Sequence, residues 1–508
     1  MAAFGVELSF GVRNIQFHPS FTGVRASIQT LQSNDDIFVE LSQTEPVYGS
    51  TDVFFNHKCQ LNFRFEKLQR VKILVLAVDQ RSSRNPVGIY GECQFDLSVV
   101  FASGGTLSLP LAGTSSLVDV TVTVPEFYSQ YLKMRFSGSH IHSPDGLPLA
   151  LYFVLVLPTG PRNLLLYKSD VVKDDKNPQW AAFSIPLYIL HFYNECSIQL
   201  RVFNQNVNHP DSYVGYITTT LTQIQRGAGT FNSYMLMHDN GHRIGEKTSV
   251  DLRLLELENG PTIFEMWRNK TNFHVTAAVD FTASNGSIVE ESSLHYIHPH
   301  RPSPYLKAIL DVIPPLLAYM PNPNSPRIGA LGFGAQVNVG NKVQLSNCFF
   351  LNSTTTDHQV LGLNGLLDAY RRTSMSAKLF GPTDFSETIY FVSKFAKAES
   401  KKRLGLYFVL LILSDGGPAN PKRTIDAIVD ASPHPMSIVA IGVGEKRNFG
   451  PMKALESPVL KHSDGRPLAR QNYIFVESSN LQDTDSLGLL TLQAVQWKRQ
   501  FDSSPLSF

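Results

Sequence analysis

Five oxygen-bearing side chains in the second half of the chain have the types and spacing to hold one divalent cation. Two are aspartates that end the strongly apolar runs FHVTAAVD and YFVLLILSD, and three are threonine or serine hydroxyls. Hard oxygen ligands of this kind suit Mg²⁺, Mn²⁺ or Ca²⁺ and not zinc or copper. The predicted ligands are Asp280, Thr282, Ser284, Thr383 and Asp415.

The small number of carboxylates in this set also predicts how the cation would be used. With only two carboxylates the cation would be under-neutralised and would bind a further carboxylate, which a partner protein could supply. The alternative interpretation is structural, because Asp, Thr and Ser also cap the first turns of helices. Two aspartate-ended strands, together with the Gly-Pro-Thr loop, favour the metal site.

The same residues argue against catalysis. An aspartate that transfers a phosphoryl group would need a second carboxylate two residues along for acid–base work, and that position is Thr282. The sequence contains neither a G-x-S-x-G nucleophile elbow nor a P-loop. We therefore expect a protein that is not an enzyme, and a metal-dependent hydrolase is the least favoured hypothesis.

The elements that would position these side chains belong to an α/β domain. After residue 270, apolar strands alternate with segments of helical spacing, which is typical of a doubly wound parallel sheet covered on both faces. Such sheets bind ligands beyond the carboxyl ends of their strands, where Asp280 and Asp415 stand. The predicted strands are 273–280, 328–337, 407–417 and 436–444, the predicted helices are 305–320, 387–399 and 424–432, and KAESKKR (397–403) predicts a solvated turn.

The first half of the chain has a different pattern. Residues 1–258 contain many short β-like runs separated by Gly, Pro, Asn and Ser clusters, which predicts all-β antiparallel sandwiches. Asp79 and Asn204 end two similar strand pairs and lie 125 residues apart. That distance is one whole domain, so we expect a tandem duplication with its boundary near residues 124–127.

Composition limits the class of protein. A length of 508 residues suggests about three domains, and 43% hydrophobic against 17% charged residues excludes a disordered chain. Lys plus Arg number 44 and Asp plus Glu 43, which gives no support for nucleic-acid binding. No apolar run is long enough to span a bilayer, the N-terminus lacks a signal-peptide pattern, and the four cysteines are dispersed. We expect a cytosolic protein that touches membranes only peripherally.

Five separated blocks of the last domain resemble the copine family, and they occur in that family's order. They are DFTASNGSIVEESSLHYI (280–297), ALGFGAQV (330–337), LFGPTDFSETI (379–389), LILSDGG (411–417) and PMSIVAIGVG (435–444). The resemblance implies a multidomain chain with two C2-type antiparallel sandwiches followed by a von Willebrand factor A-like domain of the α/β doubly wound class. We expect these domains at 1–125, 128–258 and 268–505. The resemblance also implies that the five predicted ligands form the metal-ion-dependent adhesion site of such domains.

The C2-type domains depart from the family pattern at their calcium loops. C2 domains hold calcium with several aspartates, because two crowded dications must be neutralised. In the first domain Arg81 follows Asp79 where a second carboxylate is expected, and in the second domain asparagines replace the paired aspartates. The degenerate positions are Asp79, Asp145, Asn204, Asn206 and Asp211. We expect the first domain not to bind calcium and the second to bind it poorly or not at all.

The resulting hypothesis is a copine-like cytosolic adaptor that associates peripherally with the cytoplasmic face of the plasma membrane and recruits target proteins through its metal-bearing domain. The alternative is a protein–protein scaffold that has lost calcium and lipid binding. In the family, calcium promotes binding to anionic phospholipids; here membrane contact would depend on basic residues, each contributing about 1 kcal/mol near an anionic surface. The candidates, which could equally form an ordinary solvated face, are Lys133, Arg135, Lys168, Lys173 and Lys176.

Overall fold

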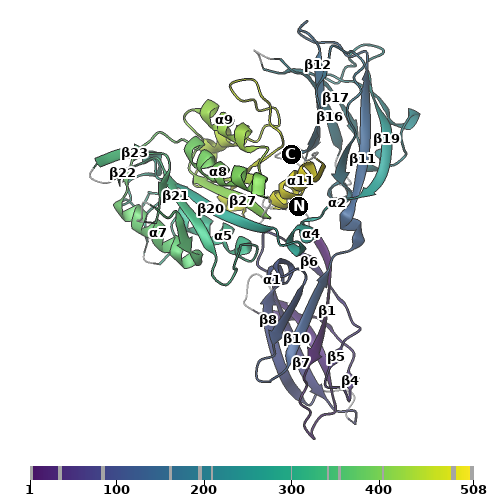
Figure 1. Ribbon diagram of the computed structural model, residues 1–508, viewed down its shortest axis with the longest axis vertical. Coiled ribbons are helices and arrows are strands. Elements are labelled where there is room, and N and C mark those ends of the chain that lie inside the picture. The colour runs from purple at the N-terminus through teal and green to yellow at the C-terminus, as the bar shows by residue number, and fades with distance from the viewer. Residues whose placement is uncertain are drawn as a thin grey trace.

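The computed structural model arranges the chain as three domains around a shared centre (Figure 1). We call them the first sandwich, the second sandwich and the α/β domain. The structure describes residues 4–31, 37–81, 86–158, 163–192, 197–206, 210–298, 300–339, 342–352, 356–402, 405–481 and 488–503. Among these residues no helix is both long and apolar enough to cross a bilayer.

The first sandwich packs two antiparallel sheets against each other. One sheet has the order β5 (Val53–Phe54), β1 (Phe4–Arg13), β10 (Leu117–Thr123), β9 (Thr106–Pro110), with β6 (Cys59–Phe63) also on β1. The other has the order β3 (Phe38–Gln43), β2 (Gly23–Leu31), β7 (Arg70–Val78), β8 (Gly88–Asp96), with β4 (Val47–Tyr48) on β2. Buried residues alternate along β1, as one face of a half-buried strand requires. Helix α1 (Leu97–Ala102) follows β8.

The second sandwich repeats this topology, with four strands in its first sheet where the first sandwich has five. Its first sheet has the order β15 (Phe183–Pro186), β11 (Gln130–Ser139), β19 (Ser249–Asn259), β18 (Ser233–Met235). Its second sheet has the order β13 (Asn163–Lys168), β12 (Ala150–Pro158), β16 (Ile198–Asn204), β17 (Ser212–Thr219), with β14 (Val172–Lys173) on β12. Short helices α2 (Leu187–Phe192) and α3 (Leu221–Ile224) complete it. Strands β7 and β16, which end beside Asp79 and Asn204, occupy the same place in the two sandwiches, as expected for a duplicated domain.

The α/β domain is built on a mainly parallel sheet. Its order is β24 (Phe349–Phe350), β21 (Arg327–Phe333), β20 (Asn272–Asp280), β27 (Leu406–Ser414), β28 (Met436–Gly442), β29 (Tyr473–Glu477), with β25 (Gln359–Leu361) on β21. Strands β20, β21, β27, β28 and β29 pair in parallel, and β24 and β25 are antiparallel edge strands. A separate small sheet has the order β23 (Lys342–Ser346), β22 (Ala335–Val339), β26 (Lys378–Leu379).

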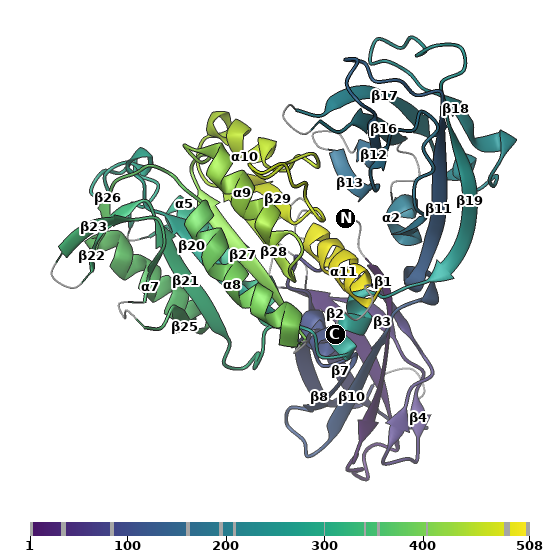
Figure 2. The same ribbon diagram turned by 45° about the horizontal axis from the view of Figure 1, so that its top comes forward.

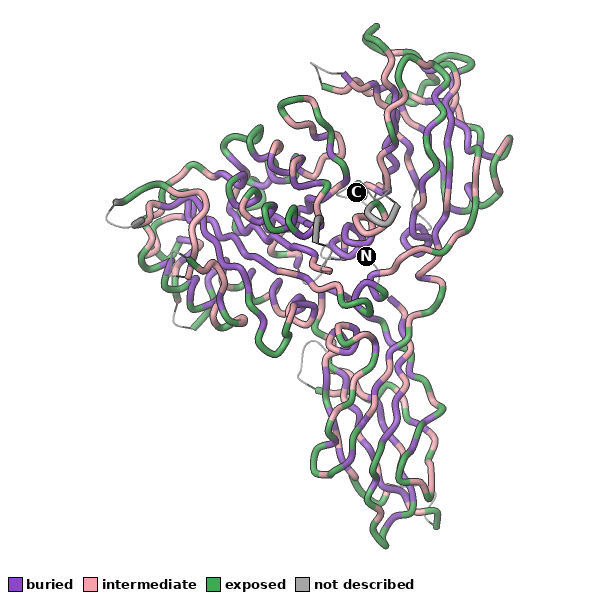
Figure 3. The backbone as a smooth tube through the Cα atoms, viewed as in Figure 1, coloured by how far each residue is buried: buried purple, intermediate pink, exposed green. Residues whose placement is uncertain are grey.

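Helices cover both faces of the main sheet, which explains why its central strands are apolar on both sides. On one face lie α8 (Ser386–Lys402), α9 (Pro421–Ala431) and α10 (Gly450–Ala454); on the other lie α5 (Pro304–Val312), α6 (Pro314–Leu317), α7 (Gly362–Ser376) and α11 (Gly488–Ser503). Figure 3 shows the buried centre of this sheet as a continuous block. The predicted fold class, two antiparallel sandwiches followed by a doubly wound α/β domain, is confirmed.

Three local predictions were wrong. The stretch 328–337 is not one strand, because the chain turns at Gly334 from β21 into the small sheet. The predicted helix 305–320 is divided into α5 and α6 at Pro314, which cannot donate the backbone hydrogen bond of a continuous helix. The predicted turn 397–403 is helical as far as Lys402, because its Lys, Ala and Glu residues are good helix formers and extend α8.

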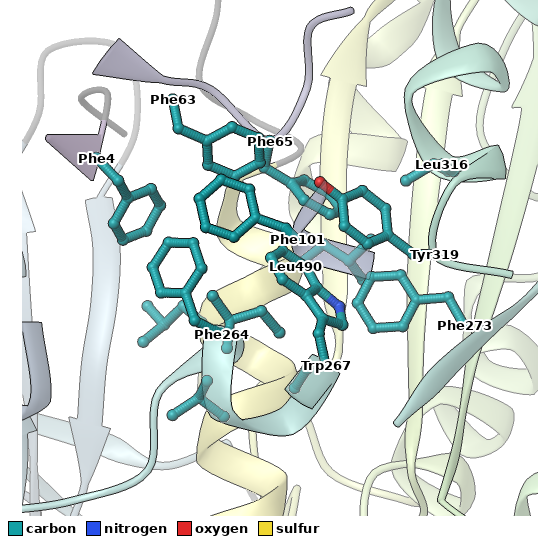
Figure 4. Packing of buried hydrophobic residues seen from close by; sticks show 14 of the residues in the cluster. Phe4, Phe63, Phe65, Phe101, Phe264, Trp267, Phe273, Leu316, Tyr319 and Leu490 are labelled. Atoms are coloured by element: carbon teal, nitrogen blue, oxygen red, sulfur yellow. The ribbon is translucent and has the colours of Figure 1, made fainter. Parts of the chain in front are cut away.

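An aromatic cluster joins the first sandwich to the α/β domain (Figure 4). Helix α4 (Ile263–Arg268), between the second sandwich and the α/β domain, supplies Phe264 and Trp267. Trp267 stacks on Tyr319 with ring centroids 4.2 Å apart and on Phe65 of the first sandwich at 5.8 Å. Phe264 meets Phe4 edge-on at 5.1 Å. Because Trp267 is only 3% exposed, the cluster fixes how the domains pack.

We expect Trp267→Ala to destabilise this junction strongly. Loss of a buried Trp side chain leaves a cavity and should lower the free energy of unfolding by about 3–5 kcal/mol. Urea unfolding followed by far-ultraviolet circular dichroism measures the change. Trp267→Phe is the matched control, because it keeps a ring and should lose less. Equal stability of wild type and Trp267→Ala would contradict the packing role.

Candidate functional site

The structure places two of the predicted ligands at one edge of the main sheet. Asp280 is the last residue of β20 and is fully buried, and Asp415 follows β27 directly. The two strands are parallel neighbours, with Val279 opposite Leu413, so their carboxyl ends meet. After β20 the chain continues to β21 on one side of it, and the later strand β27 lies on its other side. The strand order therefore reverses at β20, and such a switch point is where open α/β sheets bind ligands.

Hydrogen bonds connect four of the five predicted ligands. The Thr282 hydroxyl donates to Asp280 Oδ1 at 2.6 Å, and the Thr282 backbone N–H donates to the same oxygen at 2.8 Å. Thr282 Oγ1 lies 2.9 Å from Ser284 Oγ, and the Ser284 hydroxyl donates to Asp415 Oδ1 at 3.1 Å. The spacing of two and four residues after Asp280 therefore places the Thr282 hydroxyl on Asp280 and the Ser284 hydroxyl on Asp415.

The fifth predicted ligand, Thr383, lies in the neighbouring loop. That loop reaches the site through a parallel bridge between Phe380 and Thr282, and the Thr383 carbonyl accepts a hydrogen bond from Ala419 at 2.9 Å. Within the described ranges its hydroxyl makes no hydrogen bond to the other four ligands. The adjacent Asp384 is already neutralised by Arg423 at 3.1 Å and is not a candidate ligand.

The electrostatics of the pair favour a cation. Burial, followed by the negative charge of Asp415, raises the pKa of Asp280 to about 7. Burial also raises the pKa of Asp415. In the part of the chain that the structure describes, no lysine or arginine pairs with either carboxylate. Two buried carboxylates side by side repel each other, and a bound dication would relieve both the repulsion and the desolvation.

The residues present therefore fit a hard divalent cation such as Mg²⁺, Mn²⁺ or Ca²⁺. Asp280, Thr282, Ser284 and Asp415 would hold it, with Thr383 as the neighbouring hydroxyl. No group of three or more His, Cys, Asp or Glu able to hold a metal occurs among the described residues. Zinc and copper are correspondingly disfavoured.

Sequence reasoning missed the side chains that orient Asp280. The Ser414 hydroxyl donates to Asp280 Oδ2, so both carboxylate oxygens are held. His295 Nε2 donates to the Asp280 carbonyl at 2.8 Å, and its Nδ1 accepts from the Tyr370 hydroxyl at 3.0 Å. Burial lowers the pKa of His295 to about 4, which keeps the ring neutral in this arrangement. Ser414 could have been noticed beside Asp415, but nothing in the sequence marks His295.

Gly334, directly after β21, allows the chain to approach Thr282 closely. Its φ is +75°, and a Cβ at this position would lie 2.3 Å from Thr282 Cγ2. A side chain there would clash with Thr282 and strain the backbone, so glycine is required. The turn that broke the predicted strand 328–337 is therefore part of the site.

The second sandwich brings its four degenerate calcium-loop positions together. Asp145 accepts from the hydroxyls of Ser143 and Ser212 and from the Asn206 amide, the last at 3.3 Å. The Ser143 bond, followed by the Ser212 bond, holds the pKa of Asp145 below its usual range. Asn204 Oδ1 accepts from the Ala150 backbone N–H at 2.7 Å, so this oxygen already serves the sandwich. The asparagines therefore supply internal hydrogen bonds in place of negative charge.

The fourth position, Asp211, is paired with a cation of the chain itself. Asp211 forms an ion pair with Lys461 of the α/β domain, and its other oxygen accepts from the Tyr152 hydroxyl at 2.7 Å. In the first sandwich, Asp79 makes a local turn contact, accepting from the Arg81 backbone N–H at 3.2 Å. These residues do not fit a calcium pair, because too few free carboxylates converge at either loop end.

The fold and the site together define a class of protein: two C2-type sandwiches followed by an A-like α/β domain with an oxygen-rich centre at its switch point. Comparison with protein-family models finds two known domains. The Copine model matches residues 293–496, and the C2 domain model matches residues 146–236. The predicted recognition of the copine family is thereby confirmed: the chain has a copine domain and, ahead of it, a C2 domain.

Solved structures give weaker likenesses. The calcium-bound C2A and C2B domains of Extended-Synaptotagmin 2 are 11% identical, covering 51% of this chain and 99% of that chain with a TM-score of 0.21. BON1-C2B is 16% identical over 26% of this chain and 94% of that chain, with a TM-score of 0.23. Human GIVD cytosolic phospholipase A2 is 10% identical over 55% of this chain and 40% of that chain, with a TM-score of 0.19. At these scores the likenesses carry no argument about function.

We expect the full chain to bind Mg²⁺ or Mn²⁺ at the α/β domain, as measured by isothermal titration calorimetry. Asp280→Ala should abolish binding, because it removes one of two carboxylates. Ser414→Ala should weaken it by about 10–100-fold, the usual effect of removing a group that orients a ligand. Asp368→Asn is the control, since that carboxylate is exposed on α7. Unchanged isotherms for Asp280→Ala would show that the site is assigned wrongly.

We also expect the lost charge of the second sandwich to be restorable. In the Asn204→Asp/Asn206→Asp variant, two added carboxylates should create a calcium site, and calcium at about 100 times its Kd would stabilise the fold by about 2.7 kcal/mol. Differential scanning calorimetry with calcium or with chelator measures the shift. The wild-type transition of this domain should not move with calcium, and a shift as large as that of the variant would contradict the degeneracy of the loops.

Proposed function

We propose that this copine-family protein is an adaptor that recruits target proteins through a divalent cation at Asp280 and Asp415. The observation that carries the proposal is the hydrogen-bonded path from Asp280 through Thr282 and Ser284 to Asp415. These residues bring two carboxylates and two hydroxyls together at the carboxyl ends of β20 and β27. A bound cation would supply Lewis acidity toward a carboxylate of the target. This chain's own residues orient the ligands and leave that position to the partner.

The chemistry of the site supports an adaptor over a hydrolase. Position 282 is a threonine whose hydroxyl is committed to Asp280, so it offers no acid–base group. The nearest histidine, His295, is buried and holds the Asp280 backbone. Neither residue is placed to move a proton to or from a substrate. We therefore propose that the protein binds its targets without transforming them.

An acidic peptide array tests recruitment. In Mg²⁺, the full chain should bind peptides with an exposed Asp or Glu, and binding should disappear with EDTA or in Asp280→Ala. Peptides in which Asn or Gln replaces the acid are the matched control. Metal-independent binding to both sets would overturn the proposal, as would hydrolysis of phosphoester substrates that Asp280→Ala abolishes.

The membrane role rests on the C2 domain and on surface charge. Copine and C2 domains are those of a membrane-associated, calcium-dependent family, and we propose peripheral association with the cytoplasmic face of the plasma membrane. Arg135, Lys173 and Lys176 are exposed on the second sandwich. Lys133 is paired with Glu256 at 3.0 Å. Lys168 is unsuited to this role, because its ammonium lies 4.8 Å from the Tyr152 ring centroid and burial lowers its pKa to about 8.

Sedimentation with phosphatidylserine vesicles distinguishes the adaptor from the scaffold alternative. We expect pelleting that is weak, unaffected by calcium and reduced by salt. Lys173→Ala/Lys176→Ala should lower the partition coefficient by about fivefold for each lysine, the equivalent of about 1 kcal/mol per charge. The absence of pelleting in both calcium and chelator would favour the scaffold that has lost lipid binding, an alternative supported by the ion pair at Asp211. Pelleting that rises steeply with calcium would contradict our account of the loops.

A further inference from the structure

A short segment of the α/β domain lies against the loop end of the second sandwich. It belongs to the connection between α10 and β29, which reaches toward β12 and β13 in Figure 2. The Lys461 ammonium forms an ion pair with Asp211 and donates to the Asn206 carbonyl at 2.6 Å. The Asp211 side chain is 2% exposed and that of Lys461 is 15% exposed. A lysine thus stands, shielded from water, among the positions that resemble calcium ligands.

The surroundings of Asp211 require a positive charge. Asp211 Oδ2 accepts from the Tyr152 hydroxyl at 2.7 Å, and Oδ1 accepts from the Asn206 backbone N–H at 3.0 Å. These neutral donors satisfy the carboxylate oxygens but do not balance the charge. A carboxylate taken out of water needs a balancing positive charge. The Lys461 ammonium supplies it by direct pairing with Asp211, and the Lys168 ammonium also interacts with the Asp211 charge.

Apolar and polar contacts extend the same interface. Val459, two residues before Lys461, packs against the cluster of Tyr152, Val154 and Val156 on the second sandwich. Lys168 donates to the Pro458 carbonyl at 3.5 Å. The segment 458–461 therefore contacts the second sandwich through an apolar side chain, a backbone carbonyl and an ammonium, and each of them meets a partner of suitable chemistry. Such a match is typical of a built binding site and is more than one surface ion pair would give.

The α/β domain holds the segment in position. The Ser463 backbone N–H donates to Asp426 Oδ1 on α9 at 2.7 Å, and Lys461 forms a β-bridge with Pro467. Arg466 pairs with Asp430 of the same helix at 3.0 Å. These contacts fix the backbone at Lys461 and in the residues that follow it. The side chain is thus presented by a folded loop, at a lower entropic cost than a free lysine would pay.

We propose that the loop end of the second sandwich is a lysine-binding site, and that Lys461 of the α/β domain occupies it in place of a calcium ion. The site consists of Asp211, the Asn206 carbonyl and Tyr152. It ties the second sandwich to the α/β domain independently of any membrane or target protein, and so goes beyond the adaptor role. A cation can bind Asp211 only by displacing Lys461.

Helix α11 forms a second contact between the same two domains. Gln496 donates to the Leu166 carbonyl at 3.3 Å, and Arg499 pairs with Glu258. The guanidinium of Arg499 also lies 4.5 Å from the Tyr131 ring centroid. Because this contact does not involve Lys461, loss of the lysine should loosen the loop end while the two domains remain joined through α11.

Hydrogen–deuterium exchange of the full chain, without lipid and with EDTA, tests the lysine site. In Lys461→Met, amide exchange in β17 and in residues 455–468 should rise by about tenfold, because the loop end opens locally. Lys461→Arg should keep most of the protection. The charge swap Lys461→Asp/Asp211→Lys should restore protection that Lys461→Asp alone removes. This readout is independent of metal or target binding, so its failure would leave the adaptor proposal standing.

Lys446→Met is the matched control, because Lys446 pairs with Glu477 within the α/β domain and is 66% exposed. Its exchange in β17 should equal that of wild type. Protection of the buried strands β27 and β28 reports whether each variant is folded. Wild-type exchange in β17 of a folded Lys461→Met would overturn the proposal. Equal loss of protection in the charge swap and in Lys461→Asp would overturn it as well.

Discussion

Compensation of carboxylate charge away from water is the constraint on which both functional regions of this protein depend. At the end of β20, Asp280 is buried beside Asp415, and the hydroxyls around them orient the oxygens without neutralising the pair. At the loop end of the second sandwich, Asp211 is equally shielded but receives an ammonium from Lys461. The first arrangement calls for an external dication, and the second is satisfied within the chain. The same electrostatic requirement therefore separates the proposed cation site at Asp280 and Asp415 from the loop end at Asp211, whose charge is already paired.

The packing of the domains determines which of these outcomes occurs. Helix α4 and its aromatic cluster join the first sandwich to the α/β domain, and α11 joins the α/β domain to the second sandwich. This packing brings Lys461 to Asp211. Asp415 lies in a different part of the α/β domain, directly after β27. Degenerate calcium loops are thus compatible with a well-packed C2-type fold. In place of the aspartate charges of a calcium site, these loops have hydrogen bonds of Asn204 and Asn206 and a contact with Lys461 of the α/β domain.

The sequence was informative wherever a pattern is local. Apolar strands ending in Asp280 and Asp415 predicted both the parallel sheet and the shared edge, and the spacing to Thr282 and Ser284 predicted which hydroxyls turn inward. One prediction was wrong at Gly334, where a turn divides what looks like a single apolar strand. Another was wrong in the last turn of α8, where charged residues suggest a turn although they are good helix formers. His295 could not be predicted, because its role depends on a fold in which it reaches the Asp280 carbonyl. The ion pair of Lys461 with Asp211 joins residues 250 positions apart and follows only from how the domains pack.

A crystal of the full chain grown with Mn²⁺ and measured at a wavelength where manganese scatters anomalously tests the central claim most directly. The account predicts an anomalous peak bounded by Asp280, Thr282, Ser284 and Asp415. It also predicts no peak beside Asp211, where the Lys461 ammonium remains in place. A peak beside Asp211 with Lys461 displaced, or the absence of density between Asp280 and Asp415, would contradict the account.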